Sequence, residues 1–468
     1  MRDEQNIALE KKLSPRQVWA LAFGCIIGCG AFIMPGDTFL VQAGPLGTAL
    51  AFGIAALAMI VVAFNYHFMI NKYPVAGGEF TYAANTFGRI NGFICAWFLG
   101  LSYLTIVPIN ATALAVIGRN LFDDIFQVGF HYQVAGFDIY FGEIVLAIVA
   151  LVVFALLSIR GVKTTGVFQM LLVIALIGGV FIVFLAAILN PHVSAKNLLP
   201  AFAPEGSKAG GILAIIAIAP FSFVGFDTIP QAAEEFNFSP KKAKGIMVLA
   251  ILFGAAMYVV ITLITAMAVP EGYATWAEYV KEAGKLEGLL SLPTFHAAKQ
   301  LLGTPGLIFI GMAVLGAILS GIMGFYMATS RLLYSMSKEK MLPEWFGRVQ
   351  EKQKTPKNAI LFVMCVSIIA PFFGRTVLGW IVDMSSVGAA IGYGYTSGAA
   401  FCYAKKQGDK KIMLTGLIGM LIAFMILVLL LVPIKGLDCS LGVESYVCLL
   451  AWSLLGWLFY KKTNKRKK

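Results

Sequence analysis

The sequence predicts an all-α polytopic membrane protein with twelve transmembrane helices, of which the first and the sixth are broken. Hydrophobic residues make up 59% of the 468-residue chain and charged residues only 13%, whereas soluble globular chains average about 45–50% and about 25%. The mean hydropathy is +0.82. Two of the long apolar runs also contain glycines and prolines, which weaken the hydrogen bonding of a straight membrane helix.

A membrane-spanning helix requires about 20 apolar residues, and twelve segments of the chain reach this length. They are 15–43, 45–70, 89–118, 139–160, 165–189, 210–236, 245–269, 305–334, 358–374, 377–404, 411–433 and 441–460. No loop between them is long enough for a soluble domain, so we expect one membrane domain. The first segment is too long for a signal peptide and lacks a small-residue cleavage site.

The basic residues predict the orientation of the chain. The net charge is +12, and with the N-terminus inside the cell, twelve spans place 28 of the 36 Lys and Arg residues on the cytoplasmic side. This distribution follows the positive-inside rule. We therefore expect a multi-pass protein of the cell (inner or cytoplasmic) membrane with both termini in the cytoplasm. Contact of its basic loops with anionic lipid headgroups accounts for the charge, without nucleic acid as a partner.

The cysteines and histidines predict neither a metal site nor a catalytic site. Five cysteines lie within spans, where a thiol is a small apolar packing group; they are Cys25, Cys29, Cys95, Cys365 and Cys402. Cys439 and Cys448 lie near the last external loop, and a disulfide between them is left open. Only His67 among the histidines lies within a span, without a Ser or Cys partner pattern, so a membrane-embedded enzyme is a remote alternative. The absence of a nucleotide-binding loop argues against a primary pump.

The first span begins at Ser14 and Pro15, which fit the N-cap and the first position of a helix. It then places Gly24, Gly28 and Gly30 within seven residues, although a glycine inside a helix costs about 1 kcal/mol relative to alanine. Two explanations are open from this segment alone. The glycines allow close helix packing, or the helix breaks here and frees backbone groups for a ligand.

The second span runs inward to Asn71, and the cytoplasmic loop after it contains a Pro-x-x-Gly-Gly turn at 74–78. The third span follows this loop. Spans four and five are joined by the short loop 160–163, so we expect them to be antiparallel neighbours. The stretch 166–189 of span five contains no ionisable residue.

The sixth span contains a second interruption, between Pro220 and Pro230, with Gly225 and Asp227 between the two prolines. These residues are incompatible with a straight, lipid-facing helix. An aspartate in a span costs about 2.5–3.5 kcal/mol on insertion scales, so Asp227 should face protein or water. A helix cap, a brace between helices and direct contact with a substrate are all open for this side chain.

The remaining spans contain fewer signals. Glu234 and Glu235 follow the second interruption and predict a cytoplasmic cap or gate that pairs with nearby Lys or Arg side chains. The longest external loop, 270–304, contains a stretch of helical character at 275–283. Span eight is rich in Gly and Ser, which is typical of a tightly packed or ion-lining helix. Span ten contains Asp383, and spans eleven and twelve have few polar groups.

The two interrupted spans are five spans apart and therefore run in opposite directions. This predicts two inverted repeats, at about 15–189 and 210–404. Broken helices at corresponding positions of two halves indicate the binding site of a transporter. Amides at the start of a half-helix favour a carboxylate, and carbonyls at its end favour an ammonium group. The predicted domains are an N-terminal tail, a transport core, peripheral helices and a basic tail, at 1–14, 15–404, 405–460 and 461–468.

Several motifs are similar to those of one transporter family. They are Gly24-x-x-Ile27-Gly28-x-Gly30-x-Phe32, Pro74-Val75-Ala76-Gly77-Gly78-Glu79, Phe223-Val224-Gly225-Phe226-Asp227 with Ala233-Glu234-Glu235, and the segment 329–336 with Leu342-Pro343. Over spans one to ten the chain resembles the amino acid–polyamine–organocation transporters, especially bacterial members related to the cationic amino acid transporter branch. The resemblance implies a leucine-transporter-like fold and a secondary transporter that moves amino acids or related amines by alternating access.

The resemblance also implies a binding site at the two breaks. The substrate carboxylate would bind the backbone amides of Gly28, Cys29 and Gly30. The substrate amino group would bind carbonyls. These carbonyls would be those near Ile26 or Ile27 and those of Phe221, Ser222 and Val224. The implied site also includes Phe223, Gly225 and Asp227. The candidates for gating or coupling are Phe226, Glu234, Glu235 and Ser320; for both Phe223 and Phe226, plain packing is the alternative.

Two departures from the family pattern leave selectivity and coupling open. Cys29 stands where relatives often have Ser or Thr, which weakens a hydroxyl contact. Some proton-coupled relatives have a lysine in helix five, which is absent here, so sodium at Ser320, exchange and another proton carrier are all open. No cofactor is expected. A polyamine or cationic amine carrier is the runner-up, but such a carrier would require more carboxylates near the breaks than Asp227.

Overall fold

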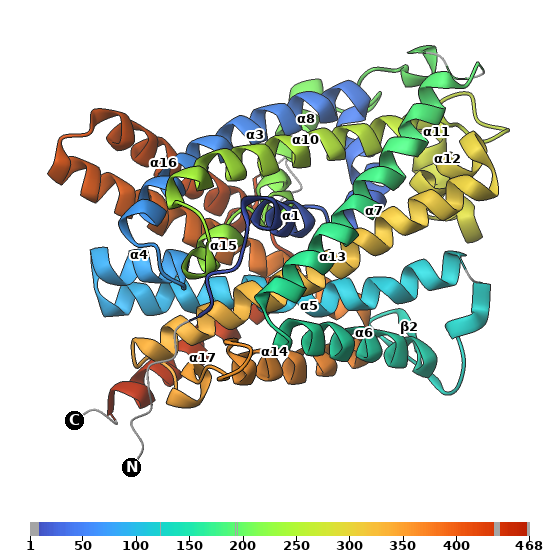
Figure 1. Ribbon diagram of the computed structural model, residues 1–468. Helices are drawn as coiled ribbons and strands as arrows, with labels where there is room; N and C mark the ends of the chain where they lie inside the picture. The colour runs from blue at the N-terminus through green and yellow to red at the C-terminus, as the bar shows by residue number, and fades with distance from the viewer. Residues whose placement is uncertain (1–8, 122, 192, 194, 435–439, 466–468) are drawn as a thin grey trace.

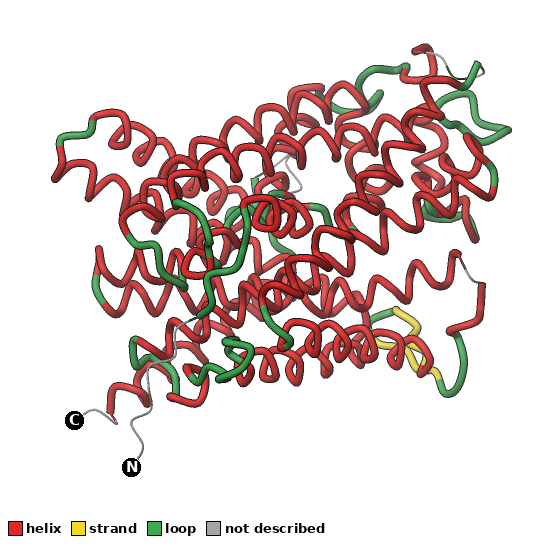
Figure 2. The backbone as a smooth tube through the Cα atoms, in the orientation of Figure 1, coloured by secondary structure: helices red, strands yellow, loops and turns green. Residues whose placement is uncertain are grey.

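The computed structural model describes residues 9–121, 123–191, 193, 195–434 and 440–465, and most of these lie in one bundle of helices (Figure 1). Within this part of the chain, nine helical segments are long and apolar enough to cross a membrane, and the helix Lys208–Ser222 is shorter but also apolar. Figure 2 shows how little of the backbone lies in strands. The molecule is therefore a multi-pass helical membrane protein.

The helices of the first half are α1 (Pro15–Ile26), α2 (Gly30–Met34), α3 (Leu40–Lys72), α4 (Gly78–Phe87), α5 (Arg89–Leu121), α6 (Phe141–Ile159) and α7 (Val162–Leu189). Those of the second half are α8 (Lys208–Ser222), α9 (Thr228–Gln231), α10 (Ala243–Met267), α11 (Trp276–Ala283), α12 (Pro293–Leu302), α13 (Thr304–Lys338), α14 (Lys357–Ile369), α15 (Gly374–Gln407), α16 (Lys410–Leu431) and α17 (Val443–Lys465). The strands β1 (His131–Val134) and β2 (Phe137–Tyr140) form an antiparallel hairpin.

Two of the membrane segments are too long to be single spans. Gly30–Lys72 contains 43 residues and Lys357–Gln407 contains 51, whereas a bilayer core about 30 Å thick is crossed by about 20 helical residues. Each segment contains a glycine at positive φ, Gly44 at 70° and Gly374 at 73°. These positions separate the predicted first span from the second and the predicted ninth from the tenth.

Both predicted interruptions are present. Helix α1 begins with a capping box between Ser14 and Gln17 and ends at Ile26, after which Ile27 is extended (φ −96°, ψ 96°). Helix α8 ends at Ser222, and α9 begins only at Thr228. The stretch between α8 and α9 contains Gly225, at φ 142°.

Helix α1 lies in the middle of the bundle and packs against α7, α10 and α13 (Figure 1). Gly24 belongs to this helix, and a Cβ there would lie 2.6 Å from Gln169 Nε2 and 2.8 Å from Ser320 Oγ. A Cβ on Gly324 of α13 would lie 2.1 Å from Cys25 Sγ. Each explanation of the glycines therefore applies to one residue: Gly24 allows close helix packing, and Gly28 lies in the break between α1 and α2.

The structure also contains elements near the ends of the bundle. The expected helix at 275–283 is confirmed as α11. The hairpin β1–β2 was not predicted from the sequence; it packs beside α6 and α15. Helix α16 packs on α15 and α3, and α17 packs on α15 and α5. Cys439, one partner of the disulfide left open above, lies outside the described residues.

Candidate functional site

The two broken segments touch each other through their backbones. A Cβ built on Gly225 would lie 2.6 Å from Ile26 N and 2.7 Å from the carbonyl carbon of Cys25. Real Cβ atoms do not approach backbone atoms this closely, and the positive φ of Gly225 also favours glycine. The fold thus brings together two segments that are about 200 residues apart in sequence.

The first break has backbone amides without partners. Ile27 N donates to Phe23 O at 3.1 Å, and Ala31 N donates to Gly28 O at 3.2 Å. Among the described residues, no acceptor is found for the amides of Gly28 and Cys29. Gly30 begins α2, and the first amides of a helix have no intrahelical acceptor. The three amides implied by the family resemblance can therefore donate to a ligand.

The carbonyl groups near the breaks are partly engaged. Ile26 O accepts a hydrogen bond from the Tyr258 hydroxyl at 3.1 Å, and Phe221 O accepts one from Val224 N at 3.0 Å. The carbonyls of Ile27, Ser222 and Val224 accept none from the part of the chain that the structure describes. These three are the acceptors that an ammonium group could use.

Tyr258 of α10 is a site residue that the sequence analysis missed. Its hydroxyl holds the last carbonyl of α1, and its electrostatic contacts include Ser222 and Cys29, one from each break. Its ring stacks on Phe52 with centroids 4.7 Å apart. A tyrosine in an apolar span is ordinary in sequence, so nothing in the pattern indicated this position.

We expect Tyr258→Phe to raise the KM for substrate about two- to tenfold, because a lost hydrogen bond is worth about 0.5–1.5 kcal/mol and the end of α1 would be held less firmly. Uptake at varied substrate concentration in proteoliposomes measures this change. Tyr326→Phe is the matched control, since its hydroxyl donates to Leu151 O at 3.0 Å, outside the breaks. An equal rise in KM for both variants would argue against a role at the site.

The aromatic side chains of the second break are packed. The ring centroids of Phe223 and Phe52 lie 6.1 Å apart. The ring centroid of Phe226 lies 5.4 Å from that of Tyr66 and 5.6 Å from that of Tyr393, and the rings of Phe226 and Tyr393 stack. Both phenylalanines are fully buried. In this conformation they form part of the walls around the breaks, and their role as a gate stays a prediction.

Asp227 is fully buried and braces the turn of the second break. Its Oδ1 accepts a hydrogen bond from Gly225 N at 2.7 Å, and its Oδ2 accepts one from the Tyr103 hydroxyl at 2.9 Å. Of the three roles considered for this side chain, these contacts match the brace between helices. Tyr103, from α5, is another residue that the sequence did not indicate.

Glu234 and Glu235 lie at the end of the bundle that also contains Leu13, in the segment before α1. Glu235 forms a buried ion pair with Arg331, with Oε1 2.8 Å from Nη2 and Oε2 3.1 Å from Nε. Glu234 Oε2 accepts from Ala76 N at 3.3 Å, in the loop before α4. Leu13 N donates to Glu235 O at 2.9 Å. These contacts link the residues after the second break to α13, to the loop before α4 and to the segment before α1, and the role of the two glutamates as a gate stays a prediction.

Hydrogen bonds within the protein already engage Ser320 and the carbonyls around it. The Ser320 hydroxyl donates to Gly24 O and Ala317 O, both at 3.0 Å. Gln169 Nε2, from α7, lies 3.4 Å from Ala20 O and 3.2 Å from Ser320 O. A cation site requires oxygen atoms that are free to coordinate it, and sodium at Ser320 would have to compete with these hydrogen bonds.

Transport is therefore expected to be independent of sodium. The measurement is uptake into proteoliposomes in sodium chloride compared with choline chloride at equal ionic strength and pH. The rates should agree, because the Gln169 amide and the Ser320 hydroxyl already donate to the carbonyls that sodium would need. A strong stimulation by sodium that is lost in Ser320→Ala would contradict this prediction.

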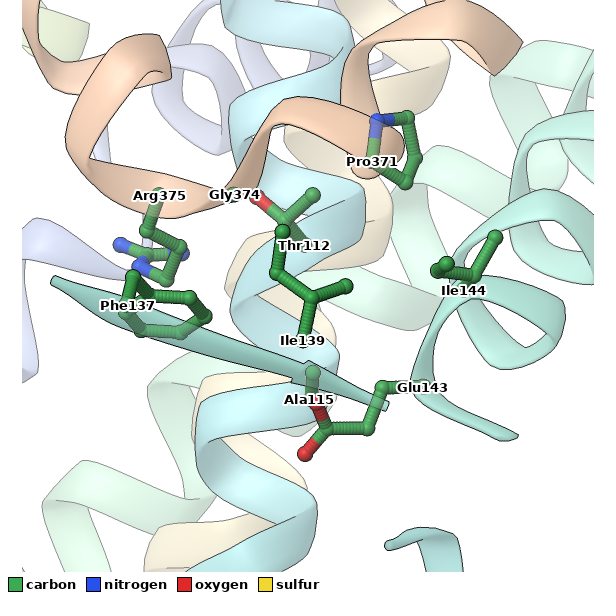
Figure 3. A pocket seen from close by; sticks show the side chains of 9 residues that line it. All are labelled: Thr112, Ala115, Phe137, Ile139, Glu143, Ile144, Pro371, Gly374 and Arg375. Atoms are coloured by element: carbon green, nitrogen blue, oxygen red, sulfur yellow. The ribbon is translucent and has the colours of Figure 1, made fainter. Parts of the chain in front are cut away.

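A cavity of about 340 Å³ reaches the second break, and it is lined by side chains of α8, α15 and α16. Pro220 and Phe221 form the wall next to the break, and its polar groups are Asp383, Ser386, Tyr393 and Ser440. Small-molecule sites commonly have volumes of about 300–1,000 Å³. A second cavity of about 20 Å³, between the β-hairpin and Arg375, is remote from the breaks (Figure 3) and has room for about one water molecule.

Comparisons with known proteins show a family match and several related transporters. A family model described as "Amino acid permease" matches residues 13–455. The branched-chain amino acid permease BcaP of Bacillus subtilis (strain 168) is 28% identical over 97% of this chain and 93% of its own length. The methylthioribose transporter of the same organism is 26% identical over 82% and 79%. Cationic amino acid transporter 8, vacuolar, of Arabidopsis thaliana is 25% identical over 75% and 56%.

Proposed function

The chain belongs to the amino acid permease family, and from that premise we propose that it is a secondary transporter that carries amino acids across the cytoplasmic membrane by alternating access. The family consists of permeases and not of enzymes, which removes the membrane-embedded enzyme as an alternative. The observation that carries the proposal is the contact of the two breaks at Gly225, beside unpaired amides and carbonyls.

Pairwise helix packing supports the proposal of twelve spans built from two inverted repeats. If α1, α3, α5, α6 and α7 correspond to α8, α10, α13, α14 and α15, several helix pairs that pack across the two halves have a counterpart when the halves are exchanged. The packing of α1 on α10 corresponds to that of α8 on α3, and α7 on α13 corresponds to α15 on α5. Likewise, α6 on α13 corresponds to α14 on α5. Such pairing is expected of two halves related by an axis in the membrane plane.

The substrate would be held mainly by backbone groups. Its carboxylate would accept hydrogen bonds from the amides of Gly28, Cys29 and Gly30, and its ammonium group would donate to the carbonyls of Ile27 and Ser222. Both sets of groups lie at half-helix ends, where the helix dipole favours these charges. This arrangement recognises the part that all α-amino acids share and leaves the side chain to the surrounding walls.

A neutral, apolar amino acid is the first candidate substrate. The cavity at the second break has mostly apolar walls, and Asp227, the acidic side chain in the second break, is engaged by Gly225 and Tyr103. The branched-chain specificity named for the Bacillus relative agrees with such a pocket. A cationic amino acid is the second candidate, since Asp383 lines the cavity and one relative is named for cationic substrates.

Uptake of labelled leucine into proteoliposomes tests the proposal, with competition by unlabelled valine, arginine and putrescine. We expect saturable uptake that valine inhibits most strongly. Stronger inhibition by arginine would assign the cationic class, and inhibition by putrescine alone would favour the polyamine carrier. A purified, folded protein that takes up none of these compounds, in either direction of the gradient, would overturn the proposed function.

A further inference from the structure

Two carboxylates lie close together inside the bundle, outside the backbone site described above. Glu79 of α4 and Asp227 of the second break are both 0% exposed. The Tyr103 hydroxyl lies between them, 2.9 Å from Asp227 Oδ2 and 3.4 Å from Glu79 Oε1. Tyr66 also donates to Glu79 Oε1 at 2.9 Å, and Gln231 Nε2 donates to Glu79 Oε2 at 2.7 Å.

Among the described residues, no Lys, Arg or His forms an ion pair with Glu79 or Asp227. The ion pairs found among the described residues join other acids to Lys or Arg, the only buried one being Glu235 with Arg331. Tyrosines and cysteines of five helices interact electrostatically with the pair: Cys25 of α1, Tyr66 of α3, Tyr82 of α4, Cys95 and Tyr103 of α5, and Tyr393 of α15. Helix α13 also packs against α4 and α9, and its Arg331 is ion-paired with Glu235. Two buried negative charges without a cation are strongly unfavourable.

The Tyr103 hydroxyl has more hydrogen-bond acceptors around it than its one proton can satisfy. Its single proton faces Glu79 Oε1, Asp227 Oδ2 and Asp227 O, the last at 3.2 Å. If both carboxyls are ionised, the Tyr103 hydroxyl can donate its proton to only one of them. Its oxygen then faces a carboxylate oxygen of the other with no proton between the two atoms. A proton on Glu79 removes the conflict, because Tyr103 then donates to Asp227 and accepts from Glu79.

Two buried side chains next to the pair have unpartnered oxygen atoms. Gln231 Oε1 has no hydrogen-bond partner among the described residues, although Nε2 of the same amide contacts Glu79. The Tyr393 hydroxyl is also unpartnered in that part of the chain, and it interacts electrostatically with both Asp227 and Glu79. Tyr393 lines the cavity of about 340 Å³, so this ring joins the cavity to the pair.

The local environment favours the neutral form of Glu79, which lies on α4, outside the membrane-spanning segments. Burial raises the pKa of the Glu79 carboxyl above its ordinary value, and the negative charge of Asp227 raises this pKa further. Hydrogen bonds from Tyr66 and Gln231 oppose the shift only in part.

We propose that Glu79 and Asp227, joined by the Tyr103 hydroxyl, form a proton-binding site that couples amino acid transport to the movement of one proton. In the conformation described, the pair holds one proton and a net charge of −1. Opening of the bundle around α4 and the second break would hydrate the pair and release the proton to that side, which leaves two carboxylates. The inference rests on the proposed function, and it assigns the coupling ion that the absence of ionisable residues from 166–189 left open.

Proton-driven uptake tests the coupling. Leucine accumulation is measured in proteoliposomes with and without an inward proton gradient, and a trapped pH-sensitive dye reports proton entry. We expect the gradient to raise accumulation in the unmodified protein and in Tyr326→Phe, whose hydroxyl donates to Leu151 O away from the pair. In Glu79→Gln and Tyr103→Phe, the ratio of accumulation with and without the gradient should fall to unity. Uptake by the unmodified protein that ignores the gradient would overturn the inference but leave the proposed function intact.

A second measurement needs no transport substrate. If folded Glu79 binds its proton more tightly than the unfolded chain does, thermal stability falls as pH rises from the ordinary carboxyl range towards the raised pKa. We expect this slope in the unmodified protein and a flatter profile in Glu79→Gln. Glu143→Gln is the control, because Glu143 pairs with Arg119 at another site, and it should keep the slope. A Glu79→Gln curve that lies parallel to that of the unmodified protein would mean that Glu79 is only a structural brace.

Discussion

Gly225→Ala is expected to lower the rate of transport roughly 100-fold or more while the protein still inserts into the membrane. The new methyl group would lie 2.6 Å from Ile26 N and 2.7 Å from the carbonyl carbon of Cys25, so two backbones would have to separate. Overpacking of this kind costs about 1–3 kcal/mol, and a non-glycine residue in a sparsely populated backbone region costs about 1–3 kcal/mol more. Because about 1.4 kcal/mol is a tenfold change in an equilibrium, the native contact of the two breaks would be a minor state.

The measurement is initial uptake per molecule of folded protein, with folding judged by gel filtration in detergent. Gly178→Ala is the control, since no atom lies within 4 Å of the position its Cβ would take. Gly28→Ala should have an intermediate effect, because its Cβ would meet only Asn110 Oδ1, at 3.5 Å. Uptake by Gly225→Ala at the rate of the Gly178→Ala control would contradict the view that the two backbones must touch for transport.

The positions of both breaks could be predicted from sequence because glycine and proline act locally. Gly28 and the pair Pro220 and Pro230 alter backbone hydrogen bonding wherever the helix is placed. The role of Gly24 could not be separated from that of Gly28 in the same way. Its small size matters only because Gln169 and Ser320 pack against it, and they belong to other helices.

The polar partners of the site could not be predicted, for the same reason. Tyr258 and Tyr103 contact the breaks from α10 and α5, and each is one of 16 tyrosines in the chain. Glu79 belonged to a motif that indicated a turn and a family resemblance but no second acid, and the fold gives it a carboxylate, Asp227, as a neighbour. Contacts between distant segments depend on helix packing, which a single sequence does not specify.

Arg331→Met is expected to be the most destabilising substitution at the end of the bundle that contains Glu235. The side chains of Arg331 and Glu235 are 2% and 0% exposed, so removing the arginine leaves a buried carboxylate without its ion-pair partner. Breaking a buried pair in this way costs about 3–5 kcal/mol. Thermal unfolding in detergent measures the loss. The double variant Arg331→Met with Glu235→Gln should regain much of it, because no unpaired charge is then buried.

The N-terminal segment should also loosen, because the backbone of Leu13 is hydrogen-bonded to the carbonyl of Glu235 and to the amide of Asn237. Limited trypsin cleavage at Lys12 should therefore be faster in Arg331→Met. Arg119→Met is the matched control: it breaks an ion pair whose arginine is 24% exposed, so its stability loss should be smaller and cleavage at Lys12 unchanged. If both variants lose equal stability and are cleaved alike, the buried pair does not hold this end together. If only Arg331→Met responds, the Arg331–Glu235 ion pair links α13 to the residues after the second break and to the segment before α1.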